Sequence, residues 1–159
     1  SADSSDVMRA GVFAMIPARR GSWCALKNAS STKEAQIFEI GVSSSHRAVE
    51  SNCEQRRFTM AERRSSLCVV ASPDSRRGTL KLAEDVVVYS AILLPGQHVV
   101  HETSPHRRAW LQVVEGELAV GDLVVSRENG AEVTGVLAIS ITAREGAEFL
   151  LIDINGGGP

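Results

Sequence analysis

The fold class is decided by residues 108–118, which read RAWLQVVEGEL. Apolar and polar residues alternate along most of this stretch, and Gly116 then marks a tight turn. Successive side chains of a strand point to opposite faces, so Leu111 and Val113 share one face while Trp110 lies on the other. The stretch therefore predicts a β-strand that ends in a turn.

The same kind of run recurs along the chain and is bounded each time by Gly, Pro, Asp or Ser. We expect strands at residues 35–42, 67–71, 79–82, 86–94, 109–114, 117–125, 136–142 and 148–154. One helical signal interrupts them, because Thr59 and Glu62 have the spacing of a capping box and predict about two turns of helix. The pattern predicts an all-β antiparallel barrel or sandwich.

The length of 159 residues corresponds to about one domain. Residues 1–33 have no sustained hydrophobic period and predict an irregular N-terminal segment, and residues 155–159 predict a frayed end.

A formal net charge of -2 argues against a nucleic-acid binder. No stretch approaches 18 apolar residues, so we expect no membrane segment. Three cysteines without a CxxC motif favour a reducing cytoplasm.

Charge is unevenly distributed along the chain. Residues 51–77 contain six arginines and three acids, whereas the sequence from Leu111 onward contains eight acids and two arginines. The opposite charges of the two regions either attract segments or subunits to one another, or belong to an ordinary solvated surface.

Residues that bind metals or move protons gather at His98, His101, Glu102 and His106. Imidazole and carboxylate suit transition metals, but the ligands must converge on one side of the backbone. In a strand, His98 and Glu102 share a face that His101 does not. A metal site of these residues therefore requires a break in the strand, and the alternative is a set of surface or rim histidines.

The spacing of Gly96 and Gly116 resembles the first motif of the cupin barrels, G-x5-H-x-H-x(3,4)-E-x6-G. Its ligand positions fall on Glu102, Ser104 and Ala109, and the histidine position of the second motif falls on Val133. The resemblance implies a single cupin (jelly-roll) barrel without the usual metal ligands.

Further blocks resemble the C-terminal half of pirin-like bicupins, the group that includes quercetinase-type proteins. They are residues 54–58 (EQRRF), 62–64 (ERR), 70–74 (VASPD) and 108–114 (RAWLQVV). The resemblance covers residues 34–154, which we expect to form the cupin domain. It implies that the metal of these proteins belongs to an N-terminal barrel, of which residues 1–33 are a possible remnant. We therefore expect no cofactor here, with a divalent transition metal such as iron as the alternative.

If side chains alternate along the motif as they do in the cupins, the residues that point into the barrel are Glu102, Ser104, Ala109, Leu111 and Val113. These residues and Val133 are the candidates for lining a pocket. A lone carboxylate in an apolar interior would suit a general base, whereas a carboxylate at the barrel mouth would be hydrated or paired with a neighbouring arginine.

The same alternation points Trp110 outward. We expect its indole to be buried by the N-terminal segment, by a partner subunit or by a second barrel. We expect a homodimer. The sequence favours a metal-free module that binds a small molecule or a protein, and the alternative is an enzyme resembling quercetin 2,3-dioxygenase.

Overall fold

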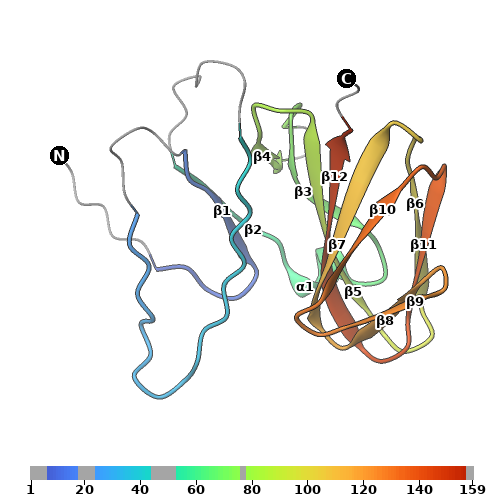
Figure 1. Cartoon of the computed structure of the whole chain (residues 1–159). Helices are drawn as coiled ribbons and strands as arrows, with labels where there is room; N and C mark the ends of the chain where they lie inside the picture. The colour runs from blue at the N-terminus through green and yellow to red at the C-terminus, as the bar shows by residue number, and fades with distance from the viewer. Residues whose placement is uncertain (1–6, 18–23, 44–52, 76–77, 157–159) are drawn as a thin grey trace.

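The computed structural model describes residues 7–17, 24–43, 53–75 and 78–156. Two β-sheets face one another and form the main body of the molecule (Figure 1). The larger sheet has six strands in the order β10-β7-β12-β5-β3-β4 and the smaller has four in the order β6-β11-β8-β9. All pairings are antiparallel except that of β3 with β4. This arrangement confirms the predicted all-β cupin architecture.

The strands of the larger sheet are β3 (Cys68–Ser72), β4 (Leu80–Lys81), β5 (Val86–Leu93), β7 (Arg107–Glu115), β10 (Gly130–Thr134) and β12 (Ala147–Asn155). Those of the smaller sheet are β6 (His98–Glu102), β8 (Glu117–Val120), β9 (Leu123–Ser126) and β11 (Ala138–Ala143). A separate two-stranded sheet pairs β1 (Val12–Met15) with β2 (Glu54–Arg57).

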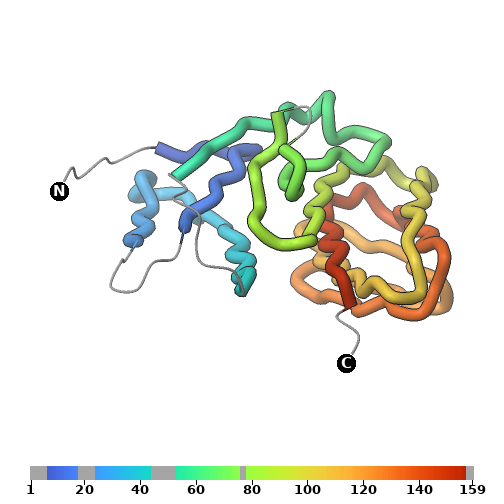
Figure 2. Tube along the Cα trace, turned by 90° about the horizontal axis from the view of Figure 1, so that it is seen from above, coloured from blue at the N-terminus to red at the C-terminus, as the bar shows by residue number. Residues whose placement is uncertain are grey.

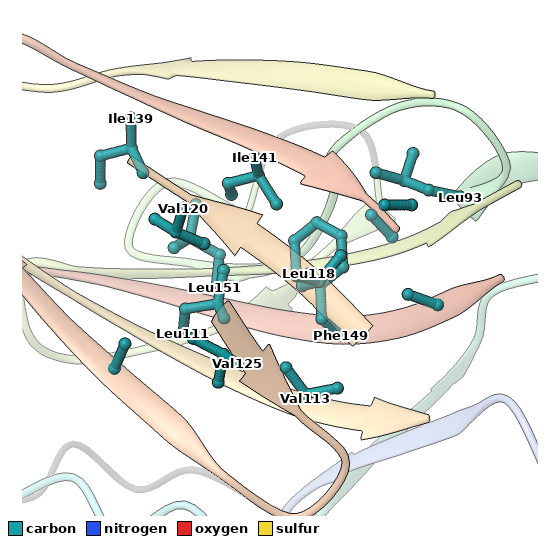
Figure 3. Close-up of a cluster of buried hydrophobic side chains, with 14 of the residues drawn as sticks. Leu93, Leu111, Val113, Leu118, Val120, Val125, Ile139, Ile141, Phe149 and Leu151 are labelled. Atoms are coloured by element: carbon teal, nitrogen blue, oxygen red, sulfur yellow. The ribbon is translucent and has the colours of Figure 1, made fainter. Parts of the chain in front are cut away.

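The inner core lies between the two sheets and is built from alternate residues of their strands. Leu111 and Val113 of β7 are fully buried there, together with Phe149 and Leu151 of β12. Figure 3 shows these side chains pointing toward Leu118, Ile139 and Ile141 of the smaller sheet. The face assigned to Leu111 and Val113 from the sequence is confirmed.

A second apolar cluster lies on the outer face of the larger sheet. Its buried members include Phe58, Val70, Leu80, Val88 and Ile152, and Phe13 packs against it. The rings of Phe13 and Phe58 meet edge to face at 5.6 Å between centroids. The N-terminal part of the chain thus covers the β3–β5 side of this face and otherwise extends beside the barrel (Figure 2).

The short helix α1 (Met60–Arg63) confirms the capping box, but its four residues make about one turn instead of the two that were expected. The Glu62 amide donates to Thr59 Oγ1 at 3.3 Å, and the Thr59 amide donates to Glu62 Oε2 at 2.6 Å. These reciprocal bonds satisfy amide groups that the first helical turn leaves unpaired. The Thr59 hydroxyl also donates to Glu62 Oε2 at 2.7 Å, and this bond, together with that of the Thr59 amide, lowers the pKa of the Glu62 carboxyl.

The strand predicted at residues 35–42 is wrong, because this segment has no strand conformation and pairs with no strand among the described residues. The run 117–125 is two strands, since Gly121 at φ 57 turns the chain between β8 and β9. β1, β2, β6 and β10 are absent from the expected strand ranges, and β12 extends to Asn155. Residues 157–159 lie outside the described part of the chain.

Gly116 joins β7 to β8 and touches the turn between β11 and β12. A Cβ atom at Gly116 would lie 2.1 Å from the carbonyl oxygen of Gly146, and its φ of 77° also disfavours any other residue. Two hairpin turns therefore meet here without room for a side chain. Among the described residues, no helix has the length and hydropathy needed to cross a membrane.

Candidate functional site

The predicted ligand cluster is divided between the two faces of β6. His101 is buried inside the barrel, whereas His98 and Glu102 are exposed on the outside. The split of the three residues between two faces is as predicted, but the inward placement of Glu102 is wrong. The physical reason is the pairing of β6 with β11, in which His101 lies opposite the buried Ile139 and Glu102 lies opposite the exposed Ala138.

His101 is held by a buried carboxylate that the sequence analysis did not single out. Its Nε2 atom lies 2.6 Å from Oδ2 of Asp153 on β12, and both side chains are more than nine-tenths buried. Thr103 Oγ1 lies 3.5 Å from the same oxygen. The hydrogen bond connects the smaller sheet to the larger one at this end of the barrel.

Arg107 supplies the positive charge for this network. Its Nε donates to Asp153 Oδ1 at 2.5 Å, and its Nη1 donates to Asp85 Oδ2 at 2.9 Å. The hydrogen bond from Arg107 lowers the pKa of Asp85, and the pKa of Arg107 is raised in turn. A buried carboxylate is tolerated where hydrogen bonds and an opposite charge compensate for lost water, and Arg107 provides both for Asp153.

The aromatic ring of Tyr89 completes the surroundings of His101. The two ring centroids lie 4.9 Å apart in an edge-to-face arrangement. Burial raises the pKa of the Tyr89 hydroxyl, and the negative charge of Asp153 adds to this effect. The second ring nitrogen of His101 has no hydrogen-bond partner among the described residues. Chemically, the arrangement is an imidazole oriented by a carboxylate, which suits proton transfer when a substrate can reach it.

A transition metal does not fit these donors. No three His, Cys, Asp or Glu side chains of the described residues are arranged to hold an ion. His101 Nε2 is hydrogen-bonded to Asp153, and Arg107 donates to the same carboxylate. The other candidate ligands, His98, Glu102 and His106, are exposed elsewhere. A metal site needs donors that converge, and the cluster identified in the sequence does not supply them.

The remaining pocket candidates contribute to packing in the structure. Ala109, Leu111 and Val113 are buried in the inner core, at 2%, 0% and 0% exposure. Val133 packs against the same core, and Ser104 is half-buried. Apolar side chains fill the interior at these positions. In the described structure the buried candidates are therefore core residues and do not line a pocket.

Two neighbouring hollows lie outside the barrel, between residues 38–43 and the outer face of the larger sheet. Their volumes are about 860 and 270 Å³, and Ile40, Gly41, Trp110 and Ile152 line both. We call the pair the outer groove. Trp110 is 42% exposed, which confirms its predicted outward direction. Arg108, Glu132, Glu84 and Asp85 lie along the larger hollow.

Trp110 is fixed in the groove by a glycine on the neighbouring strand. A Cβ atom at Gly130 of β10 would lie 2.4 Å from Cζ2 of the indole, so the ring occupies the space above the glycine backbone. The indole Nε1 donates to Gln112 Oε1 at 3.4 Å. An aromatic ring laid over an edge-strand glycine is a known way of covering it. The groove therefore has an aromatic wall.

The three cysteines are free. Cys24 and Cys53 are exposed and Cys68 is partly buried. Burial raises the pKa of the Cys68 thiol, and the charge of Glu62 adds to the rise while Arg63 opposes it. A thiol with a raised pKa is a weak nucleophile at neutral pH, so Cys68 lacks the activation of a catalytic cysteine.

Comparisons with known proteins agree with the fold and the sequence blocks. Residues 69–154 match the family model of the quercetinase C-terminal cupin domain. A quercetin 2,3-dioxygenase of Escherichia coli strain K12 is 31% identical over 154 residues, covering 97% of this chain and 65% of the relative. A putative quercetin 2,3-dioxygenase of Pasteurella multocida is 27% identical and covers 92% and 63%. The chain thus spans less than two thirds of the length of these relatives.

Among solved structures, the bacterial pirin YhhW from Escherichia coli in complex with nickel(II) superposes with a TM-score of 0.65 at 33% identity. The match covers 71% of this chain and 48% of that one. A second structure of YhhW gives a TM-score of 0.66 at 32% identity, covering 72% and 48%. The family model matches more than half of the chain, so this protein belongs to the pirin-like cupins, with residues 69–154 forming its quercetinase C-terminal cupin domain.

Proposed function

We propose that this cupin barrel is a metal-independent binding module that interacts through its outer groove and does not itself oxygenate a substrate. The observation that carries the proposal is the bonding of His101, whose Nε2 is engaged by Asp153 while the other candidate ligands lie outside. Oxygenation of a flavonol requires a redox-active metal, because protein side chains do not carry out one-electron chemistry of this kind.

The groove supports the binding part of the proposal. Binding sites are concave and mostly apolar with a few polar groups, and their volumes are typically about 300–1,000 Å³. The larger hollow, at about 860 Å³, combines Trp110, Ile152 and Ile154 with charged lining residues. A protein segment or a small molecule would bury the exposed indole there. The three free cysteines are consistent with a reducing, cytoplasmic setting, which is part of the proposal.

The test of this function is the consumption of quercetin by the purified chain, with and without added iron, nickel or copper, together with elemental analysis. The E. coli relative serves as the positive control for the assay. We expect no turnover above buffer and no stoichiometric metal. Turnover that is lost in His101→Ala and retained in His98→Ala would overturn the proposal.

The second candidate is a metal-dependent enzyme resembling quercetin 2,3-dioxygenase. It is favoured by the names of the curated relatives and by the nickel(II) complex of the bacterial pirin. In this chain, His101 would first have to leave Asp153 before it could bind an ion through Nε2. Metal-dependent protection of His101 from chemical modification would support this candidate without relying on activity.

A further inference from the structure

The sequence contains two Asn-Gly pairs, and both lie at an end of a strand in the larger sheet. Gly130 of the first pair begins β10, and Asn155 of the second ends β12. Both asparagines are exposed and both glycines are half-buried. A glycine has no Cβ atom to obstruct an attack by its amide nitrogen on the preceding side chain. The two pairs therefore match in exposure and in covalent structure.

The amide of Gly130 donates to no acceptor among the described residues. β10 is an edge strand that pairs with β7 in the larger sheet. The Val113 amide of β7 donates to the Asn129 carbonyl at 3.0 Å, and hydrogen-bonded pairs alternate with non-bonded pairs along an antiparallel ladder. Gly130, opposite Gln112, therefore has a non-bonded position and turns its amide toward the open edge.

The peptide group between Asn129 and Gly130 is also polarised. Its carbonyl oxygen accepts a second hydrogen bond, from Gln112 Nε2 at 3.1 Å. Hydrogen bonds polarise one another, so two bonds at the carbonyl oxygen make the amide proton of the same peptide group easier to remove. In the described chain the Asn129 side chain makes one hydrogen bond, from Nδ2 to the Arg127 carbonyl at 3.4 Å. This exposed side chain is free to turn toward the Gly130 nitrogen.

The second pair is held by hydrogen bonds at both residues. The Gly156 amide donates to the His106 carbonyl at 2.9 Å, and the Asn155 amide donates to the Asp85 carbonyl at 3.2 Å. A Cβ atom at Gly156 would lie 2.2 Å from the same His106 oxygen, so the two backbones are in close contact. The nitrogen that would attack Asn155 is therefore occupied until the end of β12 separates from the start of β7.

We propose that Asn129 is a site of spontaneous deamidation and isoaspartate formation in the folded protein, whereas the fold protects Asn155. The Gly130 nitrogen gives its proton to hydroxide and bonds to Cγ of Asn129. The Cγ–Nδ2 bond breaks, and ammonia leaves with a proton taken from water. Water then opens the resulting succinimide ring, at Cγ to give aspartate or at the backbone carbonyl carbon to give isoaspartate. The sequence of steps needs no oxidant or reductant.

Isoaspartate changes the edge of the larger sheet beside Trp110. The main chain then runs through the former side chain, which adds one backbone carbon before Gly130. The indole lies directly over this glycine, because a Cβ atom there would be 2.4 Å from Cζ2 of Trp110. The longer chain therefore displaces the start of β10 from under the ring.

The first experiment is peptide mapping by mass spectrometry after the folded chain has been kept in mildly alkaline buffer. We expect deamidation at Asn129 to exceed that at Asn155 by at least about tenfold, because Asn155 reacts only when β12 opens locally. In denaturant the hydrogen bonds are lost, and the two sites should react at similar rates. Equal rates in the folded chain, or the same ratio in denaturant, would overturn the inference.

A second experiment detects isoaspartate directly, through labelling of its free carboxyl group by an isoaspartyl methyltransferase and a radioactive methyl donor. The label should be lost in Asn129→Ser and retained in Asn155→Ser, which is the matched control at the other exposed asparagine. Circular dichroism confirms that both variants are folded. Label that persists in Asn129→Ser and falls in Asn155→Ser contradicts the assignment.

The change beside Trp110 has its own readout. The Tm of the wild type should fall as isoaspartate accumulates, whereas the Tm of Asn129→Ser should stay constant over the same incubation. A constant Tm in wild-type protein that carries isoaspartate would show that β10 is not displaced.

Discussion

The two faces of the six-stranded sheet are covered to different extents. Toward the smaller sheet, Leu111, Val113 and Phe149 are completely buried. On the other face, burial decreases across the sheet from Val88 on β5 to Trp110 on β7. Both faces are built by the same strands, so the difference comes from what covers them. The inner face is covered by the chain's own second sheet, and the outer face is covered in part.

This difference indicates where stability and binding are located. Close-packed side chains lose many contacts when one is shortened, and the inner face has this packing. A half-exposed side chain contributes less to folding and is available to a partner. The predictions below test that division, beginning with the largest expected effect.

Phe149→Ala should destabilise the fold by about 3–5 kcal/mol, because it leaves a cavity in the inner core that the surrounding strands cannot fill. Urea unfolding followed by far-UV circular dichroism measures the change. A loss below about 1 kcal/mol would show that the inner face is loosely packed, and would remove the contrast between the two faces.

Asp153→Ala should cost about 1.5–3 kcal/mol, since it removes the hydrogen bond to His101 that joins the two sheets and the hydrogen bond from Arg107 within the larger sheet. Glu102→Ala is the matched control at the same end of the barrel, and should change stability by no more than about 0.5 kcal/mol because Glu102 is exposed. Equal effects of the two substitutions in thermal unfolding would contradict the structural role assigned to the His101–Asp153 pair.

Trp110→Ala should reduce the free energy of unfolding by about 1 kcal/mol or less in the isolated chain. The indole is 42% exposed, and its removal uncovers the backbone of Gly130 rather than opening a core cavity. The measurement is urea unfolding at protein concentrations low enough to dissociate any dimer. A loss as large as that of Phe149→Ala would place Trp110 in the core instead of the groove.

Asp85→Asn should have the smallest effect, visible as a change in pH dependence. The Arg107 hydrogen bond lowers the folded-state pKa of Asp85, so its contribution to stability is present above the unfolded pKa of about 3.9 and is lost as pH falls through the folded value. The difference in unfolding free energy between wild type and variant should therefore shrink below about pH 3.9. A difference that stays constant into acid would contradict the assigned bond.

Much of the barrel could be predicted from the sequence because alternation is a local signal. Leu111 and Val113 have the expected face, and Trp110 has the opposite one. Residues 35–42 show the limit of this reasoning. Their composition is typical of a strand, but a strand also needs a neighbour, and the described chain provides none there.

The candidate site was only partly predictable. His101 was singled out, but the faces of β6 were assigned by counting from Gly96, whereas its actual orientation follows from pairing with Ile139. Asp153 lies 52 residues from His101 in the sequence, so no local pattern joins them. One signal was available, since Asp153 is an acid at an inward position of the otherwise apolar run 149–154.

The contact at Gly116 has a practical consequence for engineering the domain. Because two hairpin turns touch there, neither tolerates an inserted peptide, a tag or new chain ends without separating β7 and β8 from β11 and β12. Gly135, between β10 and β11, has nothing within 4 Å of an added Cβ atom and is exposed. Fusions, epitope grafts and circular permutants of this barrel should therefore be opened at Gly135.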